Sequence, residues 1–287
     1  MPQSDDLEGM LARKYERLSP KLRAAADFVA ANPVEIATRS LRAVAAASGL
    51  APVTFSRLAR ALGCDSYEEL REAARARIGR SLSSFSRKAE RLQSESRHAA
   101  QEPFLERQSA ACTENIRALA GQVSHDVLER VVERLHRARS VLLVGGLGSL
   151  GIVDYMSYMA SYFARNWRLA PRRGTSLGAI LADLGPKDAL FVVTKPPFAR
   201  ASVMAAEMAS RQGAFVIVVT DNRACPALGH ADARLVVPSE SPQFFSSYAA
   251  TLVLIETIIG MLVVRAGPSA RKRIRDVENR NRLLQEI

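Results

Sequence analysis

A short basic helix face is the first group of residues in this sequence that could do chemistry. The stretch Ser40–Gly63, SLRAVAAASGLAPVTFSRLARALG, predicts two short helices joined near Gly49. If Phe55 and Leu58 face inward, the opposite side of the second helix is basic and has no carboxylate. This face comprises Pro52, Val53, Ser56, Arg57 and Arg60, and Thr54 and Ser56 could add hydrogen bonds. Arginine can bind guanine edges or phosphates and valine can contact a thymine methyl group. The pattern therefore predicts a helix-turn-helix that binds double-stranded DNA through the helix Pro52–Leu62.

The residues around the turn support this interpretation, with one exception. Ala45 is small enough to lie where two helices cross closely, and Gly49 can adopt a positive φ at low cost. Pro52 can open the second helix because its missing N–H needs no partner there. Ala51, however, offers no side-chain acceptor at the capping position. The alternative interpretation is an Ala-rich helical hairpin whose arginines are only solvated.

A second candidate site lies beyond the carboxyl ends of predicted parallel strands, where open α/β sheets bind ligands. The first strand, Val141–Val144, is followed by the loop Gly145–Gly151, whose backbone N–H groups could bind an anion. The third strand, Leu190–Thr194, is followed by Lys195. The candidate ligand-binding residues are Gly145, Gly148, Ser149, Thr194 and Lys195, and Arg172 or Arg173 could join them. The alternative is a tight strand-to-helix turn beside a solvated Lys195.

These loops carry no signature of a dinucleotide cofactor or of catalysis. Gly146, Gly148 and Gly151 satisfy the spacing GxGxxG, but Pro171-Arg172-Arg173 follows the second strand where an acidic residue would bind a ribose. No histidine lies near the strand ends, so no catalytic residue is predicted. The cysteines lack metal-ligand spacing, so no metal is predicted. Glu256, within an apolar run, is expected to form a structural pair, for example with an arginine. A buried carboxylate with a shifted pKa is the alternative.

Length and composition indicate a two-domain protein with an anionic partner. The chain has 287 residues and a formal net charge of +11, from 40 basic and 29 acidic residues. The basic excess is spread along the chain, so charge alone does not locate the binding face. Three widely separated cysteines and an amino terminus without an apolar core favour a reduced, cytoplasmic protein. The apolar run Ala249–Val264 is shorter than a membrane span, which predicts a buried helix and no membrane partner.

Apolar periodicity divides the chain into three parts. Residues 1–79 form an all-helical helix-turn-helix domain, in which Ser66 and Glu69 make a capping box. Residues 80–123 form an exposed Ser- and Arg-rich linker and a connecting helix. Residues 124–287 alternate helices with short β-type runs, which predicts an α/β domain with a five-stranded parallel sheet flanked by helices. The predicted strands are Val141–Val144, Trp167–Ala170, Leu190–Thr194, Phe215–Thr220 and Leu235–Val237.

In this order of parts the chain resembles the RpiR family of bacterial transcriptional regulators, which combine a helix-turn-helix domain, a linker helix and a sugar-isomerase (SIS) domain. The segment LRAVAAASGLAPVTFSRLARALGCDSYEEL is similar to the family's helix-turn-helix and the helix start that follows it. Val141–Ser149 resembles the opening strand and glycine loop of the SIS domain. GAFVIVVTDNRACPALGHAD is similar to its fourth strand, Thr-Asp turn and Ala-Asp approach to the fifth strand.

The resemblance implies a homodimer or tetramer that binds an operator with two-fold symmetric half-sites, and a phosphosugar effector in the SIS crevice. One loop departs from the family. Where sugar-phosphate-binding members have Ser-x-Ser-Gly-x-Thr, this chain has Thr194-Lys195-Pro196-Pro197-Phe198-Ala199. The prolines remove two N–H donors, and Phe198 adds an apolar wall. Three interpretations follow: Lys195 restores affinity for an anionic sugar phosphate, the effector is a different small acid, or the domain only dimerises.

The sequence thus predicts a sequence-specific transcriptional regulator, not an enzyme, whose DNA affinity is modulated by a small anionic ligand. The alternative from another class is an isomerase-type enzyme for sugar phosphates, built on the SIS fold with a helical appendage. That alternative requires a base in the crevice. A third possibility is an interaction module that binds no DNA.

Overall fold

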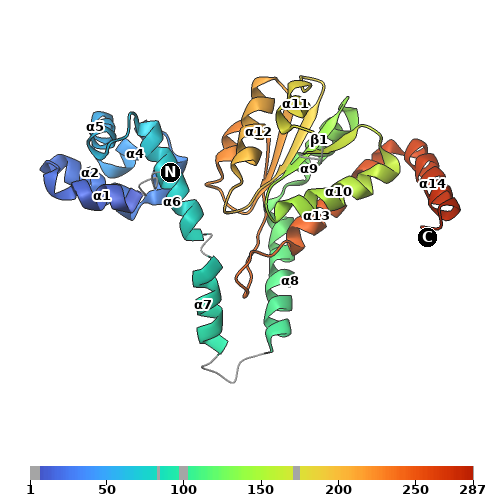
Figure 1. Ribbon diagram of the computed structural model, residues 1–287, viewed down its shortest axis with the longest axis horizontal. Helices are drawn as coiled ribbons and strands as arrows, with labels where there is room; N and C mark the ends of the chain where they lie inside the picture. Colours follow the sequence, from blue (N-terminus) through green and yellow to red (C-terminus); the bar gives the residue numbers. More distant parts are fainter. Residues whose placement is uncertain (1–6, 83–84, 97–102, 171–174, 287) are drawn as a thin grey trace. The chain divides into compact units, whose positions relative to one another are not determined.

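The computed structural model of the chain describes residues 7–82, 85–96, 103–170 and 175–286. They form two compact units, drawn in Figure 1. One is helical and lies within residues 1–84, and the other is an α/β unit that begins at Phe85.

The helical unit packs its helices around α5. Its elements are α1 (Leu7–Lys14), a 3-10 turn (Tyr15–Arg17), α2 (Pro20–Ala31), α3 (Pro33–Thr38), α4 (Leu41–Ser48), α5 (Pro52–Leu62) and α6 (Tyr67–Leu82). Phe55 of α5 is fully buried, and its ring meets those of Phe28 and Tyr67 edge to face, at centroid distances of 6.1 and 6.4 Å. Leu58 and Leu62 lie on the same buried side. The inward face of α5 is therefore the one that its apolar spacing predicted.

Proline and hydroxyl side chains start these helices where the sequence indicated. Pro52 occupies the first turn of α5. Ser40 caps α4 by accepting a backbone hydrogen bond at 3.3 Å. Ser66 accepts from the N–H of Glu69 at 3.3 Å, as predicted for the capping box. The Glu69 carboxylate accepts from the N–H of Asp65 at 2.6 Å, one residue before the usual partner.

The segment that the sequence presented as an exposed linker contains a helix, α7 (Phe85–Ser96). Phe85, Ala89 and Leu92 recur at helical spacing and are partly buried, while most residues between them are exposed. The Phe85 ring stacks on that of Phe245 at a centroid distance of 4.8 Å. The Ser and Arg content of the segment concealed this short amphipathic pattern.

The α/β unit is built on a five-stranded parallel sheet in the order β2-β1-β3-β4-β5, which confirms the predicted fold class. Its strands are β1 (Val141–Gly145), β2 (Trp167–Ala170), β3 (Ala189–Val193), β4 (Phe215–Thr220) and β5 (Ala233–Val236). Every residue of β1, β3 and β4 is buried, as expected for parallel strands covered on both faces. β2 is an edge strand and is partly exposed.

Helices cover both faces of this sheet (Figure 1). They are α8 (Phe104–Gln122), α9 (His125–Arg137), α10 (Ser149–Phe163), α11 (Leu177–Ala182), α12 (Arg200–Arg211), a 3-10 turn (Pro226–His230), α13 (Ala249–Ala266) and α14 (Pro268–Leu283). Side chains of α9, α10 and α13 share one core cluster with the strands. The helices α11 and α12 lie on the opposite face (Figure 1). In turn, α8 packs on α13, and α14 packs on α10.

The helix α13 is apolar on most sides. Among the described residues it is the helix whose length and composition would allow it to cross a membrane. One side of it is buried in the core of the α/β unit, through Ala250, Leu254, Ile255, Ile258 and Leu262.

Glu256 lies on the outer side of α13 and is exposed, which excludes the alternative of a buried carboxylate. It forms a structural pair as expected, but with a tyrosine and not with an arginine: its carboxylate accepts a hydrogen bond from the hydroxyl of Tyr155 at 3.0 Å. The side of α13 that carries Glu256 faces away from the sheet, and Thr257, Gly260 and Val264 on this side are exposed as well. The apolar composition of α13 did not indicate that one side of this helix is exposed.

Candidate functional site

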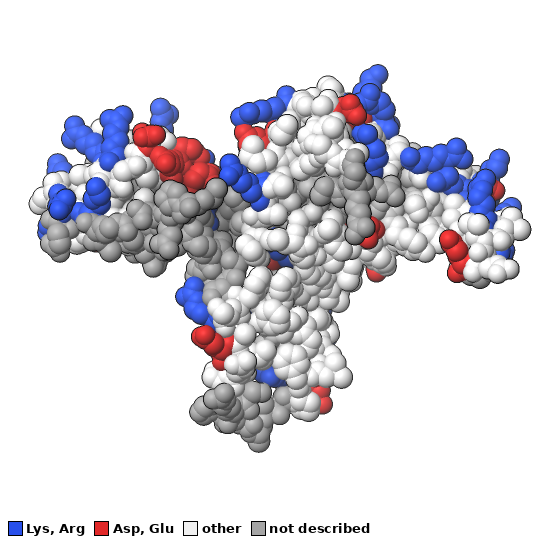
Figure 2. All heavy atoms as spheres, in the orientation of Figure 1, with Lys and Arg blue, Asp and Glu red and all other residues white. Residues whose placement is uncertain are grey.

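The residues predicted to contact DNA lie on the outer side of α5. Pro52, Val53, Arg57 and Arg60 are exposed, and Thr54 and Ser56 are partly exposed. Within the part of the chain that the structure describes, neither Arg57 nor Arg60 forms a salt bridge. In Figure 2, lysine and arginine side chains gather over the end of the helical unit where α5 lies, beside the acidic first turn of α6. The two guanidinium groups are therefore available to an anion outside the protein.

The connection between α4 and α5 is a tight turn at Gly49. Gly49 ends α4 with a φ of +70°, a conformation that glycine adopts without strain. The Ser48 hydroxyl donates to the carbonyl of Ala45 at 3.0 Å and accepts from the N–H of Leu50 at 3.2 Å. Ala51 supplies no side-chain cap, as its type predicted. The start of α5 thus depends on the turn and on Pro52 rather than on a capping hydroxyl.

The glycine loop after β1 is shaped by close contacts with other segments. A Cβ atom at Gly145 would lie 2.5 Å from a backbone oxygen of α10, and one at Gly146 would lie 2.3 Å from Cβ of Ala199. At Gly148, a Cβ atom would lie 3.1 Å from the ring of Phe245. Three segments of the chain therefore meet at this loop, and two of the three positions leave no room for a side chain.

Two backbone N–H groups at this loop form hydrogen bonds with carbonyl groups of the loop itself. The N–H of Ser149 donates to the carbonyl of Gly146, and the N–H of Leu150 donates to that of Leu147, both at 3.1 Å. These two donors close the strand-to-helix turn and do not face an open anion site. In this structure Gly145 and Gly148 act through close packing.

Ser149 and Lys195 come together in the interior against Tyr248, and Thr194, the residue before Lys195, is buried as well. The exposed fractions of Ser149, Thr194 and Lys195 are 2%, 1% and 6%. Ser149 Oγ lies 2.9 Å from the hydroxyl of Tyr248, and Lys195 Nζ lies 4.1 Å from the centre of the same ring. Lys195 Nζ also donates to the carbonyl of Ser247 at 2.8 Å. Lys195 is therefore not the solvated side chain of the alternative interpretation.

Burial shifts the proton affinities of this cluster. Desolvation lowers the pKa of Lys195 from 10.5 to about 8, against an opposing effect of the Asp221 carboxylate. Burial also raises the pKa of Tyr248, and the hydrogen bond from Ser149 offsets this in part. Asp221 Oδ2 accepts from the Ser239 hydroxyl at 2.6 Å, but Asp221 Oδ1 is buried without a partner. A ligand with an anionic group for Lys195 and a hydroxyl for Asp221 would satisfy both.

The segment Ser239–Tyr248, which we call the strap, covers this cluster. It joins β5 to α13 and supplies the carbonyl and the ring that contact Lys195. On its other side, Asn115 of α8 donates to the carbonyl of Glu240 at 2.7 Å and accepts from its N–H at 3.0 Å. Asn115 is 2% exposed, so this pair of bonds is shielded from water.

Sequence analysis missed the strap and its tyrosine. The rule that selected Thr194 and Lys195 was their place after a parallel strand, and the strap follows β5 in the same way. Applied to the fifth strand, the same rule finds the beginning of the strap at Ser239, but not Tyr248, which lies at the far end of the strap next to α13.

Some predicted participants cannot be placed. Arg172 and Arg173 lie outside the described residues. In the described part of the chain, no group of three or more His, Cys, Asp or Glu side chains could hold a metal ion. Among the described residues, Cys64, Cys112 and Cys225 are not joined by disulfides.

The buried Lys195 predicts a distinctive pH dependence of stability. Because its pKa is lower in the folded chain, the unfolded chain binds more protons between about pH 8 and 10.5. The free energy of unfolding of the wild type should therefore rise over this interval relative to Lys195→Met, by up to about 3 kcal/mol. Urea unfolding at neutral and at alkaline pH measures the difference.

The exposed Lys187 provides the control for this experiment. Lys187→Met should keep a constant offset from the wild type across the same range. A constant offset for Lys195→Met would show that Lys195 is not desolvated in the folded chain.

The α/β unit, which contains the cluster of Ser149, Lys195 and Tyr248, is similar to known proteins. Residues 135–261 match the family model of the SIS domain. The sugar isomerase domain of an RpiR transcription factor from Sphaerobacter thermophilus has a similar structure, with a TM-score of 0.59 and 21% identity over 62% of this chain and 99% of that chain. The NanR protein of Vibrio vulnificus, complexed with ManNAc-6P, is similar over 97% of this chain and 99% of that chain, with a TM-score of 0.63 and 19% identity.

A putative sugar-phosphate isomerase from Listeria monocytogenes is less similar, with a TM-score of 0.49 and 18% identity over 56% of this chain and 87% of that chain. No curated protein sequence matches this chain. The family model and the parallel sheet flanked by helices lead to the same conclusion: the second unit of this chain contains an SIS domain.

Proposed function

We propose that this chain is a cytoplasmic, DNA-binding transcriptional regulator whose affinity for DNA is modulated by a small anionic ligand in its SIS domain. The observation that carries the proposal is the outer face of α5, which follows the turn at Gly49 and presents two arginines that form no salt bridge with any described residue. The similarity to an RpiR transcription factor and to NanR, the latter across 97% of this chain, supports it.

The helix α5 suits the major groove in length and in chemistry. Its 11 residues rise about 16 Å along the helix axis. Arg57 and Arg60 are three residues apart and lie on one side, so both reach the same stretch of groove. One guanidinium can bind a guanine edge while the other binds a phosphate, and Val53 can contact a thymine methyl group.

A homodimer would present two such helices. The outer side of α13 and the adjoining side of α10 expose Leu150, Tyr155, Thr257, Gly260 and Val264. Val264 is 82% exposed, and the space above Gly260 is open, so a second helix can approach closely. Dimerisation here gives a two-fold axis, which the half-sites of the operator share. A tetramer would pair two such dimers.

The effector is a small acid, and a sugar phosphate is the first candidate. The NanR structure contains ManNAc-6P in a protein of similar fold. In this chain Lys195 supplies the positive charge, and Ser149, Thr194 and Asp221 Oδ1 supply polar partners for hydroxyl groups. The strap covers these groups, so the ligand must displace it, and the strap is bonded to α8. Ligand binding is thereby coupled to α8, with a coupling energy of about 1–3 kcal/mol.

The alternative function is that of a sugar-phosphate isomerase. One observation supports this alternative function. The Lys195 amine, with a pKa of about 8, can lose its proton near physiological pH and could serve as a base. Turnover distinguishes this alternative from effector binding.

Removing the two arginines of α5 should abolish specific DNA binding. In gel shifts with the promoter region of the chain's own gene, Arg57→Ala with Arg60→Ala should remove the retarded band. If Arg57 contacts a guanine, Arg57→Ala alone should relax preference at one base position by about 1–3 kcal/mol, whereas a phosphate contact should weaken all sequences alike. Lys21→Ala removes an exposed cation from α2 and should leave the band in place. An unchanged band for the double variant would exclude α5 as the DNA-binding helix.

A charge on the outer face of α13 should break the dimer. Val264→Asp places a carboxylate where the second copy would pack, so sedimentation should report a monomer. Met204→Asp alters another exposed apolar residue, on α12 at the other face of the sheet, and should stay dimeric. A wild type that is itself monomeric, or a dimeric Val264→Asp, would rule out this interface.

A ligand of the crevice should raise the melting temperature of the full chain. Screening sugar phosphates and small organic acids should reveal a stabilising ligand, because a ligand that binds only the folded state raises its stability. Lys195→Met should lose this effect, while Lys187→Met retains it. Failure of every ligand would favour a domain that only dimerises, and conversion of a sugar phosphate to product would favour the isomerase.

A further inference from the structure

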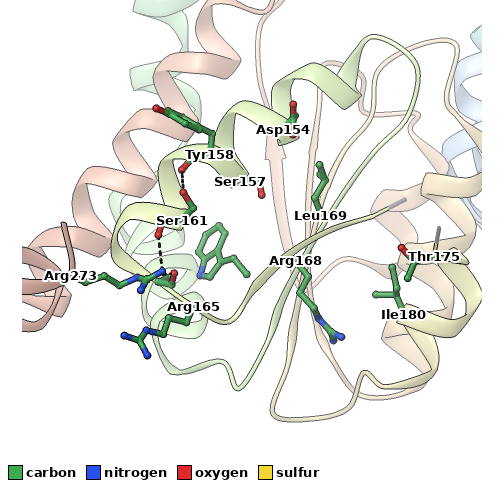
Figure 3. Close-up of a pocket in the computed structure, with 12 residues that line it drawn as sticks. Asp154, Ser157, Tyr158, Ser161, Arg165, Arg168, Leu169, Thr175, Ile180 and Arg273 are labelled. Atoms are coloured by element: carbon green, nitrogen blue, oxygen red, sulfur yellow. Dashed lines mark hydrogen bonds between the residues drawn. The ribbon is translucent and has the colours of Figure 1, made fainter. Parts of the chain in front are cut away.

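A second pocket lies at the open edge of the sheet and shares no residue with the crevice (Figure 3). Its volume is about 640 Å³, within the range of small-molecule sites. It is bounded by α10, the edge strand β2, α11 and α14. Because β2 has a neighbouring strand on one side only, the space beside it is open to a ligand.

Three arginines line this pocket: Arg165, Arg168 and Arg273. Arg273 reaches from α14 to the end of α10, where its Nε donates to the carbonyl of Ala164 at 3.2 Å and its Nη2 to that of Ser161 at 3.0 Å (Figure 3). These bonds orient the guanidinium but do not neutralise it.

The positive charge of the pocket is only partly balanced. Arg168 has the carboxylate of Asp183 at 3.8 Å. Within the described ranges, neither Arg165 nor Arg273 forms a salt bridge. Asp154 contributes a single negative charge to the lining, on the earlier part of α10 (Figure 3). Arg273 binds carbonyls at the carboxyl end of α10, a structural role that leaves its charge without a described carboxylate.

The rest of the lining is apolar and aromatic. Trp167 and Leu169 of β2 and Ile180 of α11 are partly buried, and Tyr158 of α10 also contributes to the lining. An inorganic ion would leave this surface unused, whereas a ligand with a flat apolar body would cover it. Arginine binds carboxylate and phosphate groups bidentately and also stacks on aromatic faces.

We infer that this pocket binds an organic anion, a carboxylate or phosphate ester with an aromatic or apolar body. Its acidic group is bound by Arg273 and Arg165, and its body lies against Trp167. This site is separate from the effector crevice. Both adjoin α10, which begins at Ser149 in the crevice and passes the pocket in its second half.

The single tryptophan of the chain makes the inference testable on the full-length protein. Because Trp167 lines the pocket and no other tryptophan is present, its fluorescence reports on this site alone. Titration with benzoate or phenyl phosphate should change the emission saturably. The neutral isostere benzamide should not.

Matched variants separate anion recognition from unspecific quenching. Arg273→Gln or Arg165→Gln should weaken benzoate and phenyl phosphate binding by about tenfold, the loss expected for a charge-assisted hydrogen bond. Arg211→Gln removes an arginine that is 77% exposed on α12 and should leave binding unchanged. Melting temperatures establish that each variant is folded, and Arg165, being exposed, tests the site without disturbing the end of α10.

Two results would overturn the inference. Equal response to benzamide would mean that the surface recognises only an apolar ring. Equal affinity in both arginine variants would mean that no anion site exists here. Neither measurement involves DNA or the crevice, so a failure here leaves the proposed regulator untouched, and the reverse also holds.

Discussion

The arrangement of the crevice depends on how closely the chain passes over itself after β1. At Gly145 and Gly146 a Cβ atom would lie within 2.5 Å of other atoms, so only glycine lets α10 start directly beside the strand. This start places Ser149 within 2.9 Å of the Tyr248 hydroxyl. The same approach brings the beginning of α12, at Ala199, against the loop. The close packing at this loop therefore brings α10, the beginning of α12 and the strap together.

Lys195 brings a buried positive charge to this arrangement. A buried ammonium group without a salt bridge is costly, and here a backbone carbonyl and an aromatic ring offset part of the cost. An anionic ligand offers stronger compensation than either. In the proposed function this charge attracts an anion, although the prolines after Lys195 remove two of the N–H donors that a phosphate loop would use.

Much of the fold could be predicted because it is encoded locally. The apolar spacing of Phe55 and Leu58 specifies which side of α5 is buried, and the apolar runs of β1, β3 and β4 specify a sheet covered on both faces. The turn at Gly49 follows from residue type alone.

The remaining features depend on contacts between distant segments, which a single sequence does not reveal. Lys195 is buried by a strap that lies some fifty residues later in the chain, so a charged residue after a strand gave no sign of its burial. Glu256 lies on the outer face of α13 and is bonded to Tyr155. Which face of this helix is outermost is decided by how its other side packs in the core. The pocket beside Trp167 is assembled from four elements, of which α14 contributes a single arginine.

The two hydrogen bonds of Asn115 join α8 to the strap. The helix has 19 residues and is roughly 28 Å long. Asn115 lies near its middle, and its bonds to Glu240 tie that point to the strap. Because the strap is bonded to α8 at Asn115, the two segments cannot separate without breaking both hydrogen bonds, so a displacement of the strap would be carried to α8.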